Sequence, residues 1–136
     1  MMHGQVALVT GASAGMGRAL ATALARAGAT VVLVSRDPGK GEEARRAIAE
    51  ATGNPRVELL VADLASQGAI RQLAQEFQCR HDRLHVLVNN AGAHIQERRL
   101  SPDSIEANLA VNHLAAFLLT NLLLDTLRAR DRKSVV

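Results

Sequence analysis

The sequence has no tryptophan, no tyrosine and only one cysteine among its 136 residues. A lone cysteine, Cys79, cannot form a disulfide within the chain or a cysteine-rich zinc site, so we expect a reducing, cytoplasmic location. Aromatic rings come from two phenylalanines alone. Because proteins that hold single-stranded nucleic acid stack the bases on aromatic side chains, this scarcity argues against that function.

The sequence also has only a small excess of positive over negative charge. Lysine and arginine number 16 against 13 aspartate and glutamate, which leaves a formal net charge of +3. The basic residues are mixed with acids, as in residues 42–46, so we predict no binding to nucleic acid. With 48% hydrophobic residues and no repeat or linker, residues 1–136 are predicted to form one domain.

No long hydrophobic run is free of polar side chains. Residues 107–124 carry no charge over nearly the length of a membrane-spanning helix, but they include Asn108, Asn112, His113, Thr120 and Asn121. Each of these would need a partner in hydrocarbon, so we predict a buried helix rather than a membrane span. Residues 1–5 lack the basic and apolar regions of a secretory signal.

Apolar runs typical of strands alternate with stretches typical of helices. Strands are predicted over residues 5–10, 31–34, 57–62 and 85–88, and helices over residues 15–27, 41–52, from Ser66 onward, and from Ser101 to about Arg130. In the third helix, Ile70, Leu73, Ala74 and Phe77 have the spacing of one buried stripe. We predict a Rossmann-type doubly wound α/β fold in three layers, with strand order 3-2-1-4, ending as a fifth strand begins at residues 134–136.

A glycine-rich loop separates the first strand from its helix. Gly11 turns the chain, Gly15 lets the backbone approach a pyrophosphate, and Gly17 lets the helix pack closely on the strand. The helix N-terminus offers unpaired N–H groups to the phosphates. The spacing is G-x-x-x-G-x-G rather than the common G-x-G-x-x-G. The loop residues predicted to bind the dinucleotide are Gly11, Ser13, Ala14, Gly15, Met16 and Gly17.

The end of the second strand carries Ser35 and Arg36. Dinucleotide folds that prefer NAD place an acid here, which binds the ribose hydroxyls. A neutral serine removes a charge that would repel a 2′-phosphate, and a guanidinium holds that phosphate with paired hydrogen bonds. We therefore predict NADP rather than NAD as the cofactor, although the neighbouring Asp37 reduces this preference. The alternative is that Arg36 is an ordinary solvated surface charge.

Two further motifs follow the third and fourth strands, namely Asp63-Leu64 and Asn89-Asn90-Ala91-Gly92. With the glycine loop, they make the whole chain resemble the short-chain dehydrogenase/reductase family. Residues 84–92 and 111–114 are similar to its retinol-dehydrogenase-like branch. The resemblance implies that Asp63 hydrogen-bonds the adenine amino group and that Leu64 lies beside the ring. It also implies that Asn90, Ala91 and Gly92 line the adenosine ribose.

The resemblance further implies that Asn112 matches a family asparagine that bends the long helix and holds a water linked to the catalytic lysine. The family moves a hydride between nicotinamide and a carbonyl or alcohol carbon, and a tyrosine handles the proton beside a lysine and a serine. This sequence has no tyrosine, and its only lysines are Lys40 and Lys133. We therefore expect this chain to be the cofactor-binding, N-terminal part of a longer NADP-dependent reductase and to be inactive on its own. Ala115 stands where the branch usually has glycine, so packing there is expected to differ.

Other residues offer weaker alternatives. His113 points about 100° away from Asn112 on a helix, so we do not expect it to replace the tyrosine. A helix end and a strand start separate His81 from His85, so surface roles are expected rather than a metal site. Cys79 is interpreted as a packing residue.

Two rival functions stay open. One is a non-catalytic NADPH-binding sensor or partner-binding module. The other is an interaction protein that dimerises through the helix at residues 107–124 and binds no cofactor.

Overall fold

Parallel strands form the centre of the molecule. The computed structural model describes residues 1–91, 102–103, 109–128 and 134–135. Within them the strands are β1 (Val6–Thr10), β2 (Thr30–Ser35), β3 (Val57–Val61), β4 (Val86–Val88) and β5 (Ser134–Val135). They form one parallel sheet in the order β3-β2-β1-β4-β5. The predicted strand order is confirmed, and the segment near the end of the chain joins the sheet beside β4.

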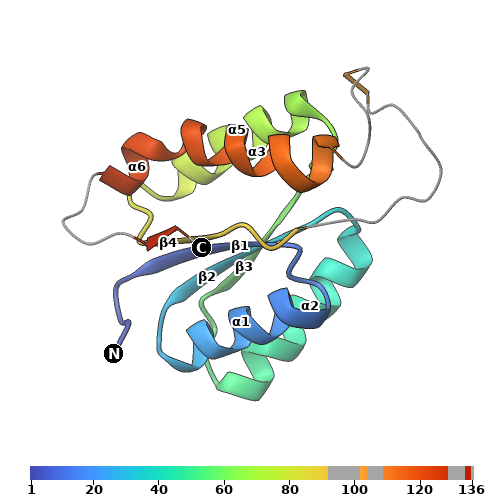
Figure 1. Ribbon diagram of the computed structural model, residues 1–136. Coiled ribbons are helices and arrows are strands. Elements are labelled where there is room, and N and C mark those ends of the chain that lie inside the picture. The colour runs from blue at the N-terminus through green and yellow to red at the C-terminus, as the bar shows by residue number, and fades with distance from the viewer. Residues whose placement is uncertain (92–101, 104–108, 129–133, 136) are drawn as a thin grey trace.

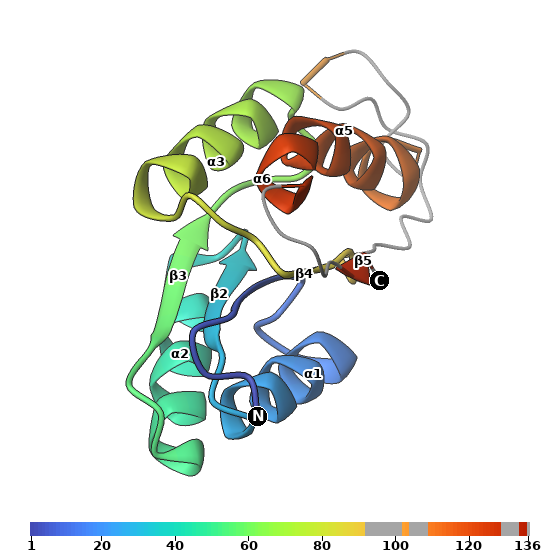
Figure 2. The same cartoon turned by 90° about the vertical axis from the view of Figure 1, so that its left-hand side faces the viewer.

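The sheet has helices on both faces. Helices α1 (Gly15–Arg26) and α2 (Pro38–Thr52) cover one face, while α3 (Gln67–Arg80), α5 (Ala115–Leu122) and α6 (Leu124–Arg128) cover the other (Figure 1). Figure 2 shows the same three layers from the side, with β3 and β5 at opposite ends of the sheet. The predicted three-layer, doubly wound α/β fold is confirmed.

Strand β1 is central and buried from Ala7 to Thr10. Leu8 lies opposite Val32 of β2 on one side and Leu87 of β4 on the other. From β1 the chain first builds outward through β2 and β3, and then crosses to β4 on the opposite side. In doubly wound sheets such a reversal opens a crevice at the carboxyl ends of the two strands, where ligands bind. The topology therefore directs attention to the ends of β1 and β4.

Two hydrophobic cores hold the layers together. One lies between the sheet and α3 with α5, and the other lies between the sheet and α1 with α2. The predicted stripe on α3 is confirmed, because Ile70, Leu73, Ala74 and Phe77 are all buried. Phe77 has no exposed surface and belongs to the first core. Apolar burial on both faces accounts for the uninterrupted apolar strands.

Two predicted helices differ from the structure. Helix α2 begins at Pro38, before the predicted residue 41, because Asp37 caps it and proline suits a first helical turn. The long helix predicted from Ser101 to Arg130 is not continuous over residues 109–128, and its predicted start at Ser101 lies outside the described residues. It consists of a π-helical turn η1 (Ala110–Leu114), α5 and α6, with Leu123 between the last two. The Asn121 side chain donates a hydrogen bond to the Phe117 carbonyl in the last turn of α5, where such local bonds compete with the helical ladder.

Two side-chain predictions were wrong. Cys79 is exposed, because it lies two residues from the buried Phe77 and so points to the other side of α3. His85 is buried rather than at the surface, and its Nδ1 atom accepts a hydrogen bond from the Val6 N–H at 2.9 Å. His81 is half-buried, with Nε2 3.0 Å from Glu58 Oε1.

Neither a metal-ligand cluster nor a helix able to span a membrane occurs among the described residues. No group of three or more histidine, cysteine, aspartate or glutamate side chains there is placed to hold a metal ion. In the same part of the chain, no helix combines the length and the apolar character needed to cross a membrane.

Candidate dinucleotide-binding site

Four segments meet at the carboxyl edge of the sheet. They are the glycine loop after β1, Ser35 and Arg36 at the end of β2, the Asp63-Leu64 turn after β3, and Asn89 to Ala91 after β4. Since parallel strands all end at the same edge, the fold brings together motifs that are far apart in sequence. Of the residues predicted to bind the dinucleotide, Gly92 alone lies outside the described part of the chain.

The glycine loop is packed tightly on one side and open on the other. A Cβ atom added to Gly17 would lie 2.3 Å from the Gly11 carbonyl oxygen and 2.4 Å from Asn90 Nδ2. At Gly15, where φ is +62°, an added Cβ would have no atom of the described residues within 4 Å beyond its chain neighbours and its own helix backbone. Gly17 therefore allows α1 to approach the turn after β4, whereas Gly15 borders open space suited to a ligand.

No side chain of the described residues caps the N-terminus of α1. Ala14 occupies the N-cap position and makes no side-chain capping bond, and the first turn holds no acidic residue. By contrast, Asp37 caps α2 and Ser66 caps α3. Gly15 and Met16 are exposed at this end. Amide donors with the positive end of the helix dipole behind them suit a diphosphate.

Thr10 joins the glycine loop to the turn after β4, and sequence analysis did not identify it. Its side chain donates to the Val88 carbonyl at 3.3 Å and accepts from the N–H groups of Asn90 and Ala91, each at 3.0 Å. Thr10 is 2% exposed. Asn90 Nδ2 also donates to the Gly11 carbonyl at 3.4 Å. The sequence feature that could have identified Thr10 is its hydroxyl side chain at the end of an apolar strand, directly before Gly11.

We expect Thr10→Val to lower the free energy of unfolding by about 1 to 2 kcal/mol, because two N–H groups lose their acceptor in a half-buried turn that water partly reaches. Urea unfolding followed by circular dichroism measures the change. Thr30→Val at the start of β2 is the matched control, since the Thr30 hydroxyl bonds to no other described residue. Equal stability of the two variants would show that the Thr10 bonds contribute nothing.

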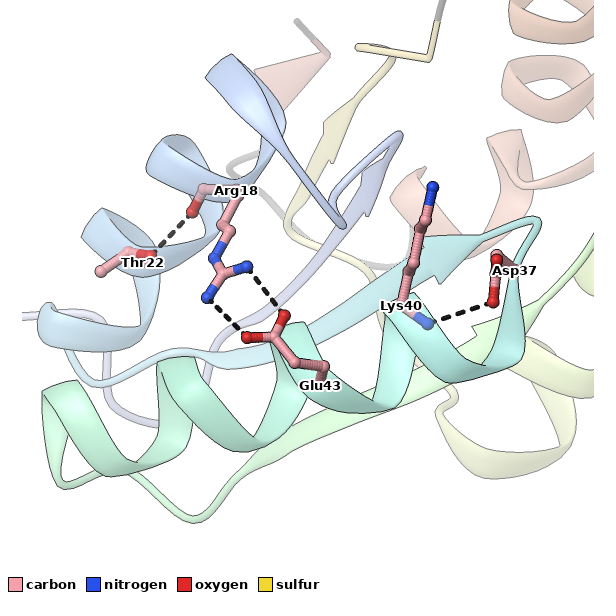
Figure 3. Close-up of polar contacts among 5 residues, drawn as sticks. All are labelled: Arg18, Thr22, Asp37, Lys40 and Glu43. Carbon is pink, nitrogen blue, oxygen red and sulfur yellow. Dashed lines mark hydrogen bonds and ion pairs between the residues drawn. The ribbon is translucent and has the colours of Figure 1, made fainter.

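Two cationic side chains, Arg36 and Lys40, lie near the end of β2, where the Asp37 carboxylate accepts hydrogen bonds. Ser35 Oγ donates to the Asp37 carbonyl at 3.0 Å and accepts from the Asp37 N–H at 3.3 Å. Asp37 Oδ1 in turn accepts from the N–H groups of Gly39 at 2.8 Å and Lys40 at 3.1 Å. Figure 3 shows the Lys40 ammonium pointing away from the Asp37 carboxylate. Arg36 and Lys40 are exposed, and neither pairs with an acid within the described ranges.

Lys40 was not among the predicted site residues. The signal that could have revealed it is Asp37-Pro38, which is typical of a helix start and puts Lys40 in the first turn of α2. Asp37 directs Oδ1 at the first N–H groups of α2, where the positive end of the helix dipole partly offsets its charge.

The turn after β3 is fixed by its own hydrogen bonds. Asp63 Oδ1 accepts from the Ala65 N–H at 2.9 Å, and the Asp63 carbonyl accepts from the Ser66 N–H at 3.1 Å. Asp103 Oδ2 also accepts from the Gln67 N–H at 2.6 Å at the start of α3. Asp63 is exposed at the sheet edge and Leu64 is half-buried against the core. A ring placed beside this turn would find both a carboxylate and an apolar contact.

Asn112 lies in the π-helical turn η1 with its side chain exposed, as is that of His113. Single π turns within helices occur often at functional sites. Asn89 Nδ2 donates to Thr120 Oγ1 at 3.1 Å, which ties the turn after β4 to α5. Ala115 is buried and lines a cavity of about 10 Å³ beside Thr10 and Asn89, so its methyl group is accommodated.

Comparisons with known proteins place this geometry in context. A sequence profile described as short chain dehydrogenase matches residues 5–136. Polyprenol dehydrogenase of Mus musculus is 46% identical over 126 residues, covering 93% of this chain and 38% of that protein. Retinol dehydrogenase 11 of Mus musculus is 45% identical over 135 residues, covering 99% of this chain and 43% of that protein. This chain thus spans less than half the length of these curated relatives.

Solved structures of short-chain oxidoreductases and dehydrogenases are also similar to this chain. A metagenomic short-chain oxidoreductase in complex with NADP superimposes with a TM-score of 0.86 at 37% identity, covering 98% of this chain and 61% of that chain. A short chain dehydrogenase from Escherichia coli CFT073 complexed with NADPH gives a TM-score of 0.83 at 32% identity, covering 98% of this chain and 57% of that chain.

Proposed function

The chain belongs to the short-chain dehydrogenase family, and from this premise we propose that residues 1–136 are the dinucleotide-binding domain of an oxidoreductase that uses NADP(H). The observation that carries the proposal is the glycine loop, which is open at Gly15 and closed at Gly17 against Asn90. In this arrangement the first amides of α1 bind the diphosphate, Asp63 and Leu64 hold the adenine, and Asn90 and Ala91 lie along the ribose.

The preference for NADP(H) over NAD(H) is supported by charge. Arg36 and Lys40 are exposed at the ribose end of the site, and Asp37 is occupied by capping α2. A 2′-phosphate placed there gains charge-assisted hydrogen bonds, and the Asp37 carboxylate accepts from the first amides of α2 through Oδ1. Two similar structures are described as complexes with NADP or NADPH.

The proposed reaction is hydride transfer between the dinucleotide and a carbonyl or alcohol substrate. The bound nicotinamide would supply the hydride chemistry. This chain would bind and orient the dinucleotide, with Asn112 in the π turn belonging to the catalytic part of the site. Because the sequence has no tyrosine, we propose that these 136 residues alone do not turn over substrate.

Isothermal titration of the purified chain with NADPH and NADH tests the proposal. We expect both to bind and NADPH to bind at least about tenfold more tightly, a difference of roughly 1.4 kcal/mol. If neither binds, the proposal fails; if the two affinities are equal, the NADP(H) preference fails. Oxidation of NADPH by aldehydes or ketones above background would overturn the expected inactivity of this chain.

The missing tyrosine also favours a second candidate, a non-catalytic NADPH-binding sensor or partner-binding module. The gene sequence around these 136 codons distinguishes the two. A downstream serine, then a tyrosine with a lysine four residues later, supports the enzyme. An in-frame stop supports the module.

We also propose that two copies associate through α5. Phe117 is 64% exposed on this helix, and large exposed apolar side chains often mark protein interfaces. Sedimentation should show a dimer that Phe117→Ser dissociates. A monomeric wild-type chain would contradict this.

A cytoplasmic location completes the proposal. Cys79 is exposed as a free thiol, and a reducing compartment keeps such thiols reduced. Imaging of a fluorescent fusion of the complete gene product tests the location, and secretion of that product would refute it.

A further inference from the structure

A second acid lies close to Lys40 on α2. Glu43 follows Lys40 by three residues, and at this spacing a helix brings lysine and glutamate side chains within reach of an ion pair. In the structure Glu43 binds Arg18 of α1 instead. Arg18 Nη1 lies 3.0 Å from Glu43 Oε2, and Arg18 Nη2 lies 3.5 Å from Oε1. Both carboxylate oxygens of Glu43 therefore face one guanidinium (Figure 3).

Lys40 has no acidic partner among the described residues. Figure 3 shows its ammonium pointing away from Glu43 as well as from Asp37. Each nearby carboxylate is engaged by a different group: Asp37 by the N–H groups of α2, and Glu43 by Arg18. Without Arg18, the carboxylate of Glu43 would attract the Lys40 ammonium along the helix and would repel a phosphate placed beside it.

We propose that Arg18 determines cofactor specificity without touching the 2′-phosphate: by holding Glu43, it keeps the Lys40 ammonium available to that phosphate. The inference rests on the proposed binding of NADP(H). Arg18 is thus a positioning residue that acts through Glu43 on Lys40. Since NADH has no 2′-phosphate, its affinity does not depend on the pair.

Titration of four variants with NADPH and NADH tests the inference. We expect Arg18→Gln to weaken NADPH by about 2- to 5-fold, the range for a modest exposed charge contact, and to leave NADH unchanged. The double variant Arg18→Gln/Glu43→Gln should recover the wild-type NADPH affinity, since no carboxylate is left to engage Lys40. In a Lys40→Gln background, Arg18→Gln should have no further effect on either dinucleotide.

Arg45→Gln is the matched control. Arg45 pairs with Glu42 on the same helix, and this hydrogen bond holds the pKa of the Glu42 carboxyl below its ordinary value. The control removes the same charge and also breaks an ion pair, but Arg45 pairs with Glu42 rather than Glu43. We expect it to leave the ratio of NADPH to NADH affinity at the wild-type value.

The outcomes separate this inference from the proposed function. If the wild-type chain binds NADPH no more tightly than NADH, the proposed NADP(H) preference fails and the inference fails with it. If wild type prefers NADPH but Arg18→Gln weakens both dinucleotides equally, Arg18 is structural and only the inference is overturned. The same holds if the double variant does not recover, as expected for direct contact between Arg18 and the phosphate. Added salt should shrink the Arg18→Gln defect by screening.

Discussion

Gly17→Ala is expected to abolish most dinucleotide binding. The new methyl carbon would lie 2.3 Å from the Gly11 carbonyl oxygen and 2.4 Å from Asn90 Nδ2. One of these atoms is backbone, so the overlap cannot be relieved by a side-chain rotation alone, and α1 must move away from the turn after β4. That shift displaces the amides that bind the diphosphate. We expect a loss of roughly 10- to 100-fold in NADPH affinity, because overpacking typically costs about 1 to 3 kcal/mol.

Gly68→Ala provides the control for this substitution. Gly68 lies in the first turn of α3, where an added Cβ would have Ser66 Oγ as its nearest neighbour at 3.8 Å. This is ordinary van der Waals contact, so alanine should leave both stability and binding close to wild type. Isothermal titration and thermal unfolding of both variants give the comparison. Binding by Gly17→Ala within twofold of wild type would show that the close approach at Gly17 is not required.

Arg36→Ala is expected to weaken NADPH by about 1 to 3 kcal/mol while leaving NADH nearly unchanged. Arg36 is exposed next to Ser35, where the ribose end of the site lies, and the nearby Asp37 carboxylate accepts from the α2 amides. A guanidinium that pairs with no described acid forms paired hydrogen bonds to a phosphate at little cost. The measurement is titration with both dinucleotides.

The control for Arg36 is Arg46→Ala. Arg46 is also exposed, but it lies beyond the first turn of α2, away from the end of β2. It should change the two affinities equally, if at all. Should Arg36→Ala reduce NADPH and NADH binding by the same factor, the role of Arg36 in selecting the 2′-phosphate is refuted.

Much of the fold was predictable because its signals are local. The apolar strands and the stripe from Ile70 to Phe77 on α3 are buried as expected. Apolar periodicity reports burial directly, and alternation of strands with helices restricts the topology to a few parallel arrangements.

Features that depend on capping and long-range pairing were harder to predict. The start of α2 at Pro38 depends on a capping bond from Asp37. The interruption at Leu123 lies within three consecutive leucines, residues 122–124, where periodicity gives no boundary. His85 is buried because its ring accepts from Val6, which requires the register of β4 against β1.

In the candidate site, too, local sequence signals predicted some features, whereas contacts between elements decided others. The glycine spacing was sufficient to predict the loop, since only glycine tolerates both the turn and the close approach. The contributions of Thr10, Arg18 and Lys40 were harder to predict, because each depends on a partner from another element or on the direction of a side chain. Sequence spacing along one helix would even have favoured the Lys40–Glu43 pair over Arg18–Glu43.

The central claim is that the first amides of α1 bind a diphosphate at the carboxyl edge of the sheet. A titration of the ¹⁵N-labelled chain with NADPH, followed by backbone amide chemical shifts, tests it most directly. We predict saturable shifts at residues 13–18 together with Asn90 and Ala91, and none at Gly28 or Gly53 at the opposite edge. Shifts confined to that opposite edge, or no shift in the glycine loop at saturating NADPH, would contradict the account.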